Sequence, residues 1–424
     1  MSTAAVKICF ILGTRPEITK LYSIIKASYR NEEVHPLIIH TGQHYDYEMS
    51  QIFLEELELP TPHYFLDVES GTHGQMTATL LVAIEKALMK EKPDIVIVLG
   101  DTNTTMAGSL AAAKQNIPVA HIEAGCRSFD YSMPEEINRI VTDSISSLFF
   151  APSEVAALNL LYEGKPSNRV FQAGNTVVDI VEETKDLRQN IVVKEIGSDK
   201  YDVVVTLHRQ ENVDDRERLK SLLEALAKID GSVIFPMHPR TRKRVNEFGL
   251  NHILSMSKNV RVIKPLNYLA FMKLLEDASV IVTDSGGVQE EAIMLGTPCI
   301  TARDTTEWPE TVWAGGNCLA GLETDIIYKK CNQMIRRQTA GEKGFQNPFH
   351  GNAGSSIISI VLAHWKEDNL RMQKPEMTGG EYPLPWLLTE RQELRREFQT
   401  SLQFDEKGKA IHQKSVSRVS RGYK

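Results

Sequence analysis

Short apolar runs recur along the first 180 residues, and each is followed by a glycine or polar turn and then by a stretch that can form a helix. Runs without alternation are typical of strands that helices cover on both faces of a parallel sheet. The pattern therefore predicts a parallel α/β half, with strands within residues 7–13, 35–42, 94–101, 118–125, 146–153 and 168–176.

The same pattern restarts after a polar connector, and it predicts further strands within residues 202–211, 232–239, 260–266, 280–287 and 298–307. We therefore expect an α/β protein of two Rossmann-like domains that face each other across a cleft. Ligands of open α/β sheets bind outside the carboxyl ends of the strands, so a ligand is expected between the two halves. The predicted domains are residues 1–185 and 186–365.

A charged extension is predicted from residue 366 to residue 424. Proline and glycine interrupt its first part, and no acidic residue follows Glu406. Such a composition is typical of a solvated tail, and docking on a partner is the alternative.

Composition narrows the class of protein. The chain of 424 residues is 42% hydrophobic and 24% charged, as an ordinary globular protein is, and its net charge of -7 does not favour nucleic-acid binding. Five cysteines without a C-x-x-C pair argue against a disulfide framework or a zinc site. The first apolar run is far shorter than a membrane span, so a cytoplasmic protein is expected.

The first predicted strand runs into the sequence GTRPEITKL, which places Gly13 at a tight turn, Arg15 beside it and Lys20 in the following helix. A helix start offers N–H groups to a phosphate, and Arg15 adds a planar charged donor. The alternative is that Arg15 only fastens the loop. The absence of G-x-G-x-x-G argues against an NAD dehydrogenase.

Carboxylates follow the next strands. Asp101 and Glu123 come directly after strands, and the helix start PEEINR adds Glu135, Glu136 and Arg139. Paired acids at strand ends are suited to removing and returning a carbon-bound proton. For Glu136 and Arg139, the alternative is a pair that charges the helix start.

Metal binding is the competing use of such acids. Asp101 and Glu123, together with His121, could ligate a hard cation, although the sequence shows no compact ligand cluster.

In the second half, His208 and Arg209 follow a strand directly, and His238 follows the next one. We expect His208 to act at the site as a catalytic group and phosphate contact. His238 is a candidate substrate contact, with a structural histidine as the alternative.

The strongest local signal is the sequence TDSGGVQEE. It forms a strand-to-helix turn whose N–H groups and hydroxyl suit a diphosphate, and Glu291 one helical turn later could reach a ribose. The predicted diphosphate turn consists of Ser285, Gly286 and Gly287.

With these residues in view, the chain resembles the non-hydrolysing UDP-N-acetylglucosamine 2-epimerases, which have a GT-B-like fold. The resemblance runs from about Lys7 to His364. It rests on the motifs GTRPE, GDTNTT, HIEAG, MPEEINR, GNTVVD, HRQEN, TDSGGVQEEA, RDTTEWPE and NPFHGNAGS.

The resemblance implies a set of roles. UDP would be held by Arg15, His208, the diphosphate turn and Glu291, with Phe271 near the uracil. Acid/base work would fall to Asp101, Glu123 and Glu135, supported by Lys20 and Arg139. UDP would be eliminated to give a 2-acetamidoglucal and then added back, which interconverts UDP-GlcNAc and UDP-ManNAc. No redox cofactor or metal is implied, and the family is usually homodimeric.

Three alternatives stay open at this point. The segment GQHYDYEMSQIF resembles the loop of epimerases that act on UDP-2,3-diacetamido-2,3-dideoxyglucuronic acid, so a related sugar is one alternative. A GT-B UDP-sugar glycosyltransferase is the second. A non-catalytic UDP-sugar sensor is the third, and the acids argue against it.

Overall fold

The computed structural model describes residues 5–42, 54–68, 71–193, 196, 199–321, 323–340 and 344–371. All of them belong to one compact unit, Met1–Arg371. Most of the predicted extension and the segment from Gln43 to Phe53 lie outside the described residues.

The first half of the described chain forms a seven-stranded parallel sheet. Its strands lie in the order β3(Tyr64–Phe65), β2(Val34–His40), β1(Val6–Leu12), β4(Ile95–Leu99), β5(Val119–Ile122), β6(Leu148–Ala151) and β7(Val170–Gln172). Every predicted strand of this half is present, and the two-residue edge strand β3 was not predicted.

The second half forms a six-stranded parallel sheet. Its order is β10(Val260–Ile263), β9(Val233–Pro236), β8(Val203–Thr206), β11(Val280–Thr283), β12(Cys299–Thr301) and β13(Asn317–Leu319). The edge strand β13 was not predicted. Two parallel sheets with crossover helices confirm the predicted α/β fold.

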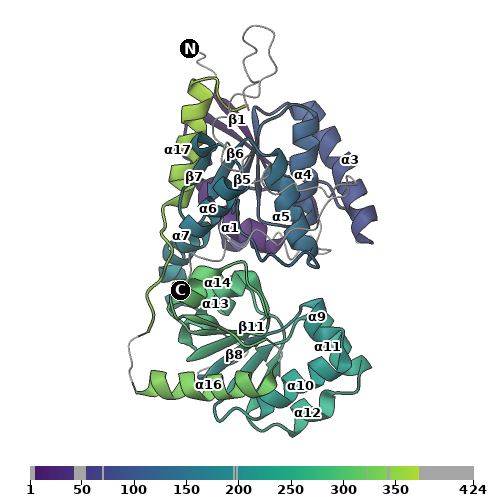
Figure 1. Cartoon of the computed structure of the whole chain (residues 1–424), viewed down its shortest axis with the longest axis vertical. Helices are drawn as coiled ribbons and strands as arrows, with labels where there is room; N and C mark the ends of the chain where they lie inside the picture. The colour runs from purple at the N-terminus through teal and green to yellow at the C-terminus, as the bar shows by residue number, and fades with distance from the viewer. Residues whose placement is uncertain are drawn as a thin grey trace, which may run out of the picture. The chain divides into compact units, whose positions relative to one another are not determined.

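Central strands are buried along their whole length, as β4 shows with five buried residues in succession. Burial on both faces requires helices on both sides of the sheet. The strands of the first sheet are connected or followed by α1(Arg15–Tyr29), α3(His73–Glu91), α4(Asn103–Lys114), α5(Pro134–Ile145), α6(Glu154–Tyr162), the 3₁₀ turn Ser167–Arg169, α7(Thr176–Glu183) and α8(Lys185–Gln189) (Figure 1).

The strands of the second sheet are connected or followed by α9(Gln210–Val213), α10(Arg216–Ala227), α11(Pro239–Glu247), α12(Asn251–Met256), α13(Tyr268–Asp277), α14(Gly286–Leu295), α15(Pro309–Trp313) and α16(Thr324–Thr339). The apolar face of α10, with Leu219, Leu222 and Leu223, packs in a core within the second half. Residues of α13 and α14, such as Leu269 and Ala292, instead pack in the cluster that also contains the first sheet.

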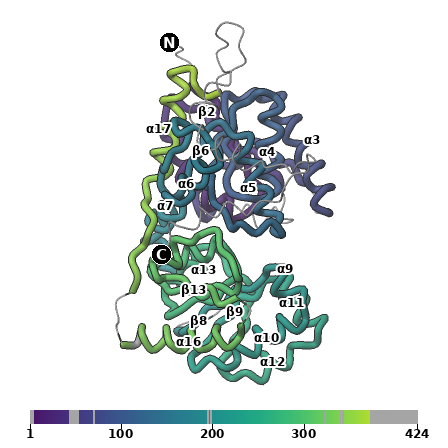
Figure 2. The backbone as a smooth tube through the Cα atoms, in the orientation of Figure 1, coloured from purple at the N-terminus to yellow at the C-terminus, as the bar shows by residue number. Residues whose placement is uncertain are grey.

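The last helix, α17(Ala353–Lys366), contacts α1 and α7 of the first half. Figure 2 follows the backbone from α16, beside the second sheet, to α17, beside the first. The chain therefore crosses between the halves twice, once before β8 and once before α17. Among the described residues, no helix is long and apolar enough to cross a membrane.

Candidate functional site

A cavity of about 780 Å³ is lined by loops that follow strands of both sheets. The predicted location at the carboxyl ends of the strands therefore holds. Nine of the predicted site residues line this cavity: Lys20, Asp101, Glu123, Glu135, Arg139, His208, Ser285, Gly286 and Gly287.

The loop after β1 is fastened by the buried Glu17. One of its carboxylate oxygens accepts the backbone N–H groups of Gly13 and Thr14, both at 2.8 Å. The other accepts the hydroxyls of Thr102 at 2.7 Å and Thr105 at 3.1 Å. Glu17 thus joins the loops after β1 and β4, from which Lys20 and Asp101 reach the cavity.

This arrangement makes the start of α1 a poorer phosphate site than the sequence suggested. The N–H groups of Gly13 and Thr14 are used by Glu17, and Pro16 has no N–H to offer. Arg15 is not among the residues that line the cavity, and its contact with UDP stays a prediction.

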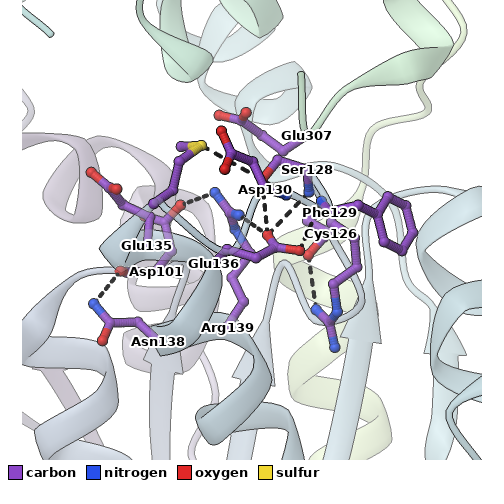
Figure 3. Close-up of polar contacts among 12 residues, drawn as sticks. Asp101, Cys126, Ser128, Phe129, Asp130, Glu135, Glu136, Asn138, Arg139 and Glu307 are labelled. Atoms are coloured by element: carbon purple, nitrogen blue, oxygen red, sulfur yellow. Dashed lines mark hydrogen bonds and ion pairs between the residues drawn. The ribbon is translucent and has the colours of Figure 1, made fainter. Parts of the chain in front are cut away.

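Asp101 is oriented by Arg139, which donates from Nη2 to Oδ2 at 2.6 Å (Figure 3). The other guanidinium nitrogen of Arg139 donates to Glu136. Glu136 is buried and also accepts the N–H groups of Ser128 at 3.0 Å and Phe129 at 2.9 Å. Glu136 therefore serves to hold Arg139 and the loop before α5, which matches the structural alternative for this residue.

Glu123 has a backbone φ of 65°, in the left-handed region that non-glycine residues seldom adopt. Strain of this kind is often found at functional sites. The Glu123 carboxylate accepts from Nζ of Lys20 at 2.5 Å, and the same ammonium donates to Glu290 at 2.6 Å. The ring of Trp308 lies 5.4 Å from this ammonium. Lys20 therefore connects the first half to α14 of the second.

His208 is held by the buried Asp284, whose Oδ1 lies 3.2 Å from its Nδ1. Asp284 also accepts the backbone N–H groups of His208 and Arg209 and the side-chain amide of Asn212. Burial alone would raise the pKa of Asp284, but these hydrogen bonds and His208 lower it below its usual value, so Asp284 stays ionised. Nε2 is then the ring nitrogen of His208 that can meet a ligand.

Cations from both halves gather beside Glu135 and Glu307. Arg209 donates from Nη1 to Glu135 at 2.9 Å, and Nη2 of Arg303 lies 2.9 Å from Glu307. Burial would raise the pKa of Glu307, but Arg303, Arg139 and Arg209 lower it to about 2. The cavity therefore has an arginine-rich wall suited to an anionic leaving group.

The turn at the start of α14 is shaped by close packing. A Cβ on Gly286 would overlap the carboxylate of Glu307, so a larger residue would force this buried side chain to move. The first N–H groups of a helix have no carbonyl partner within the helix and can bind an anion. The backbone at Gly286 and Gly287 is therefore presented to the cavity as the sequence predicted.

The contacts of His121 argue against the metal alternative. Its Nδ1 lies 2.7 Å from Asp143 and its Nε2 lies 2.8 Å from the carbonyl of Gly100, so both ring nitrogens are engaged in the interior. Asp101 and Glu123 are meanwhile bound to Arg139 and Lys20. Within the described part of the chain, no group of three His, Cys, Asp or Glu side chains is arranged to hold a metal ion.

Three more predicted residues lie away from the cavity lining. His238 is the N-cap of α11, where its Nδ1 accepts the N–H of Arg240, and its ring is 5.4 Å from that of His208. Phe271 packs against the hydrophobic core from α13. Glu291 lies on α14, and burial raises its pKa to about 7. Their contacts with substrate stay predictions.

The residues that the sequence did not single out are Glu17, Asp284, Glu290, Arg303 and Glu307. All five lie within motifs quoted above, but among them Asp284 alone directly follows a strand, so membership of a motif was the available signal. Their partners come from distant parts of the chain, so their roles could not be assigned from the sequence.

Two parallel α/β halves, with acids at the strand ends of one and a glycine turn at a helix start of the other, define an enzyme with a GT-B-like fold. The family model described as UDP-N-acetylglucosamine 2-epimerase matches residues 26–362. The chain belongs to this family, so the resemblance inferred from its motifs is confirmed.

Two relatives match this chain along almost their whole length. The UDP-N-acetylglucosamine 2-epimerase of Methanocaldococcus jannaschii is 49% identical over 368 residues, which cover 84% of this chain and 98% of the relative. The UDP-2,3-diacetamido-2,3-dideoxy-D-glucuronate 2-epimerase of Pseudomonas aeruginosa is 42% identical over 364 residues, which cover 84% of this chain and 99% of the relative.

Solved structures show the same fold. The M. jannaschii enzyme in complex with UDP-GlcNAc and UDP has a TM-score of 0.79 and 47% identity, over 84% of this chain and 100% of that one. The UDP-GlcNAc 2-epimerase from Neisseria meningitidis bound to UDP-GlcNAc has a TM-score of 0.77 and 36% identity, over 84% of this chain and 100% of that one.

Proposed function

We propose that the chain is a non-hydrolysing UDP-N-acetylglucosamine 2-epimerase that interconverts UDP-GlcNAc and UDP-ManNAc. The observation that carries this proposal is the cavity in which three acids of the first half, Asp101, Glu123 and Glu135, lie opposite the diphosphate turn of α14. The high identity to relatives named for this activity supports it.

The reaction would proceed by elimination and re-addition. A carboxylate removes the C2 proton, the electrons of the C2–H bond form the C1=C2 double bond, and the C1–O bond breaks so that its electron pair leaves with UDP. UDP then adds back to C1 of the 2-acetamidoglucal while an acid delivers a proton to the other face of C2. We assign the proton transfers to Asp101, Glu123 and Glu135.

The cations of the cavity would stabilise the departing UDP. Arg209 and Arg303 line the cavity together with His208 and the diphosphate turn, and the charges of the two arginines oppose the negative charge that develops on the leaving oxygen. Arg15, the turn residues, Glu291 and Phe271 are proposed to hold UDP itself, and no metal or redox cofactor is proposed.

A related sugar is the second candidate, because a relative at 42% identity is named for UDP-2,3-diacetamido-2,3-dideoxy-D-glucuronate. The loop that suggested this sugar lies within residues 43–53, outside the described residues. A glycosyltransferase is disfavoured, because it would need an acceptor site and one general base rather than a cluster of three acids.

The decisive experiment is incubation of the purified protein with UDP-GlcNAc alone, in D₂O and in the presence of EDTA. We expect the manno isomer to form with deuterium at C2, since a proton lost to a carboxylate exchanges with solvent. Product without deuterium would reject the elimination route. If UDP-GlcNAc is unchanged but the diacetamido uronate is epimerised, the sugar assignment is wrong.

Further aspects are proposals from the sequence and the family. These are a homodimer in the cytoplasm and a division of the described unit near residue 185, between α8 and β8, with α17 returning to the first half.

A further inference from the structure

Glu290 is a fully buried carboxylate that none of the roles above includes. It lies on α14, one turn beyond the diphosphate turn, and its side chain is 0% exposed. It accepts from Nζ of Lys20 at 2.6 Å and from the side-chain amide of Asn175 at 2.9 Å. Asn175 is the N-cap of α7, so Glu290 contacts two elements of the first half.

The ammonium of Lys20 is shared between two carboxylates. It lies 2.5 Å from Glu123 and 2.6 Å from Glu290, and the side chains of Lys20 and Glu123 are only 12% and 9% exposed. Charge interactions are strong where water is excluded, so removing one of the three charges alters the other two. The charge on Glu290 therefore acts on Glu123 through the ammonium of Lys20 that they share.

We propose that Glu290 is a positioning residue: its negative charge divides the hold of Lys20 between two carboxylates and so controls how firmly Lys20 binds Glu123. This inference rests on the proposed proton-transfer role of Glu123. A neutral residue at position 290 would leave Glu123 as the negatively charged partner of Lys20. Glu123 would then accept the C2 proton less readily, because the full charge of the ammonium would stabilise its ionised form.

Because α14 begins with the diphosphate turn and continues to Glu290, the same helix contacts both ends of the reaction. The turn lies at the leaving group, while Glu290 reaches the proton-transfer group through Lys20. A displacement of α14 relative to α1 would change the Lys20–Glu290 distance and with it the state of Glu123.

The charge on Glu290 depends on pH. Burial raises its pKa well above the usual value and Glu123 raises it further, while Lys20 and the hydrogen bond from Asn175 lower it. For Lys20, burial would lower the pKa, but Glu123 and Glu290 raise it above its usual value, so Lys20 stays charged. The titratable or polar groups that face Glu290 are Lys20 from α1, Glu123 and Cys126 after β5, Asn175 before α7 and Tyr268 from α13.

The test compares the wild type with Glu290→Gln, which has nearly the same shape but no charge. With UDP-GlcNAc as substrate we expect kcat to fall about 10- to 100-fold, while KM and the Kd of UDP change less than about threefold. The wild-type to variant ratio of kcat should be largest at alkaline pH, where wild-type Glu290 is ionised, and should shrink towards acidic pH. Groups remote from Glu290, which titrate alike in both proteins, cancel in this ratio.

The control is Glu224→Gln, which removes one charge from the exposed face of α10 and should leave all of these values unchanged. A purely structural role for Glu290 would lower kcat by the same factor at every pH, and that result would overturn the proposal. An unchanged kcat would overturn it as well.

Should Glu290→Gln fail to fold, Glu290→Asp provides the test, because it keeps the charge and only shortens the reach to Lys20. Its kcat should stay closer to that of the wild type than the 10- to 100-fold loss expected for Glu290→Gln, and a loss of that size in a folded Glu290→Asp at alkaline pH would overturn the proposal. A crystal structure of Glu290→Gln gives a readout that needs no reaction: Lys20 should keep its ion pair with Glu123, with at most a neutral hydrogen bond to the amide that replaces the Glu290 carboxylate. A wild type that fails to epimerise UDP-GlcNAc would instead reject the proposed function.

Discussion

Arg209 of the second half donates to Glu135 of the first half at 2.9 Å, and both side chains line the cavity. Replacing Arg209 with Ala should lower kcat about 10- to 100-fold, because Glu135 loses its orienting partner. The double variant Arg209→Ala, Glu135→Gln should be little worse than Glu135→Gln alone, since contacting residues are not additive. Steady-state kinetics of the three variants measure this coupling, and full additivity would show that the pair is not a unit.

Asp101 should be essential for turnover but not for UDP binding. We expect Asp101→Asn to reduce kcat by about 10² to 10⁴, the range for general acid/base groups, with little change in the Kd of UDP. Calorimetric titration with UDP and a product assay separate the two effects. A parallel loss of UDP affinity would mean that Asp101 contacts the nucleotide or supports its site.

Glu291 should contribute to UDP affinity. If it accepts a hydrogen bond from the ribose, Glu291→Ala weakens UDP binding by about 1.5 to 3 kcal/mol. Titration with UDP at pH 8, where the carboxylate is ionised, measures the difference. An unchanged Kd would remove Glu291 from the binding site, in agreement with its absence from the cavity lining.

The same carboxyl group should make stability depend on pH. Its pKa is about 7 in the folded protein, against 4.5 as the reference for an unperturbed glutamate, because burial disfavours the charged form. As pH rises from 4.5 to 7, the unfolded chain loses this proton first, so the free energy of unfolding falls. Glu291→Gln has no ionisable group at this position, so its free energy of unfolding does not fall for this reason. Its stability relative to the wild type should increase over that range by on the order of 3 kcal/mol and then level off.

Denaturant unfolding at several pH values measures this difference. The exposed Glu224→Gln serves as a control and should show no such trend. A constant difference between Glu291→Gln and the wild type would mean that Glu291 is solvated.

We expect that the chain can be shortened to Arg371, but not to Asp368, without loss of stability. Arg169 donates to the carbonyls of Asn369 at 2.6 Å and Arg371 at 2.9 Å, and Leu370 is buried. A chain that ends at Arg371 should keep its melting temperature and activity. A chain that ends at Asp368 should melt several degrees lower, because Arg169 loses its partners. Equal stability of the two truncations would show that these contacts contribute nothing.

The central strands could be predicted because each is a continuous apolar run between turn residues. The edge strands β3 and β13 could not, since strands of two or three residues leave no periodic signal. Their formation depends on pairing with β2 and β12 rather than on local preference.

For the site, the sequence identified residues that follow strands directly, such as Asp101 and Glu123. The family resemblance assigned acid/base work to Glu135 and not to Glu136, its neighbour on the helix start, but the residues alone gave no physical reason for this choice. The structure separates them: Glu136 is buried among the N–H groups of Ser128 and Phe129, whereas Glu135 faces the cavity and Arg209. Contacts between residues that are distant along the chain make this difference.

The two glycines of the diphosphate turn are constrained by different neighbours. At Gly286 an added methyl group would collide with Glu307, whereas at Gly287 no protein atom lies within 4 Å of the added methyl group. Selection for a stable fold alone would therefore keep glycine at position 286 but tolerate alanine at position 287. If position 287 is invariant in evolving populations, the cause is the bound molecule rather than the polypeptide, and an alanine there would yield a well-folded protein that has lost its ligand.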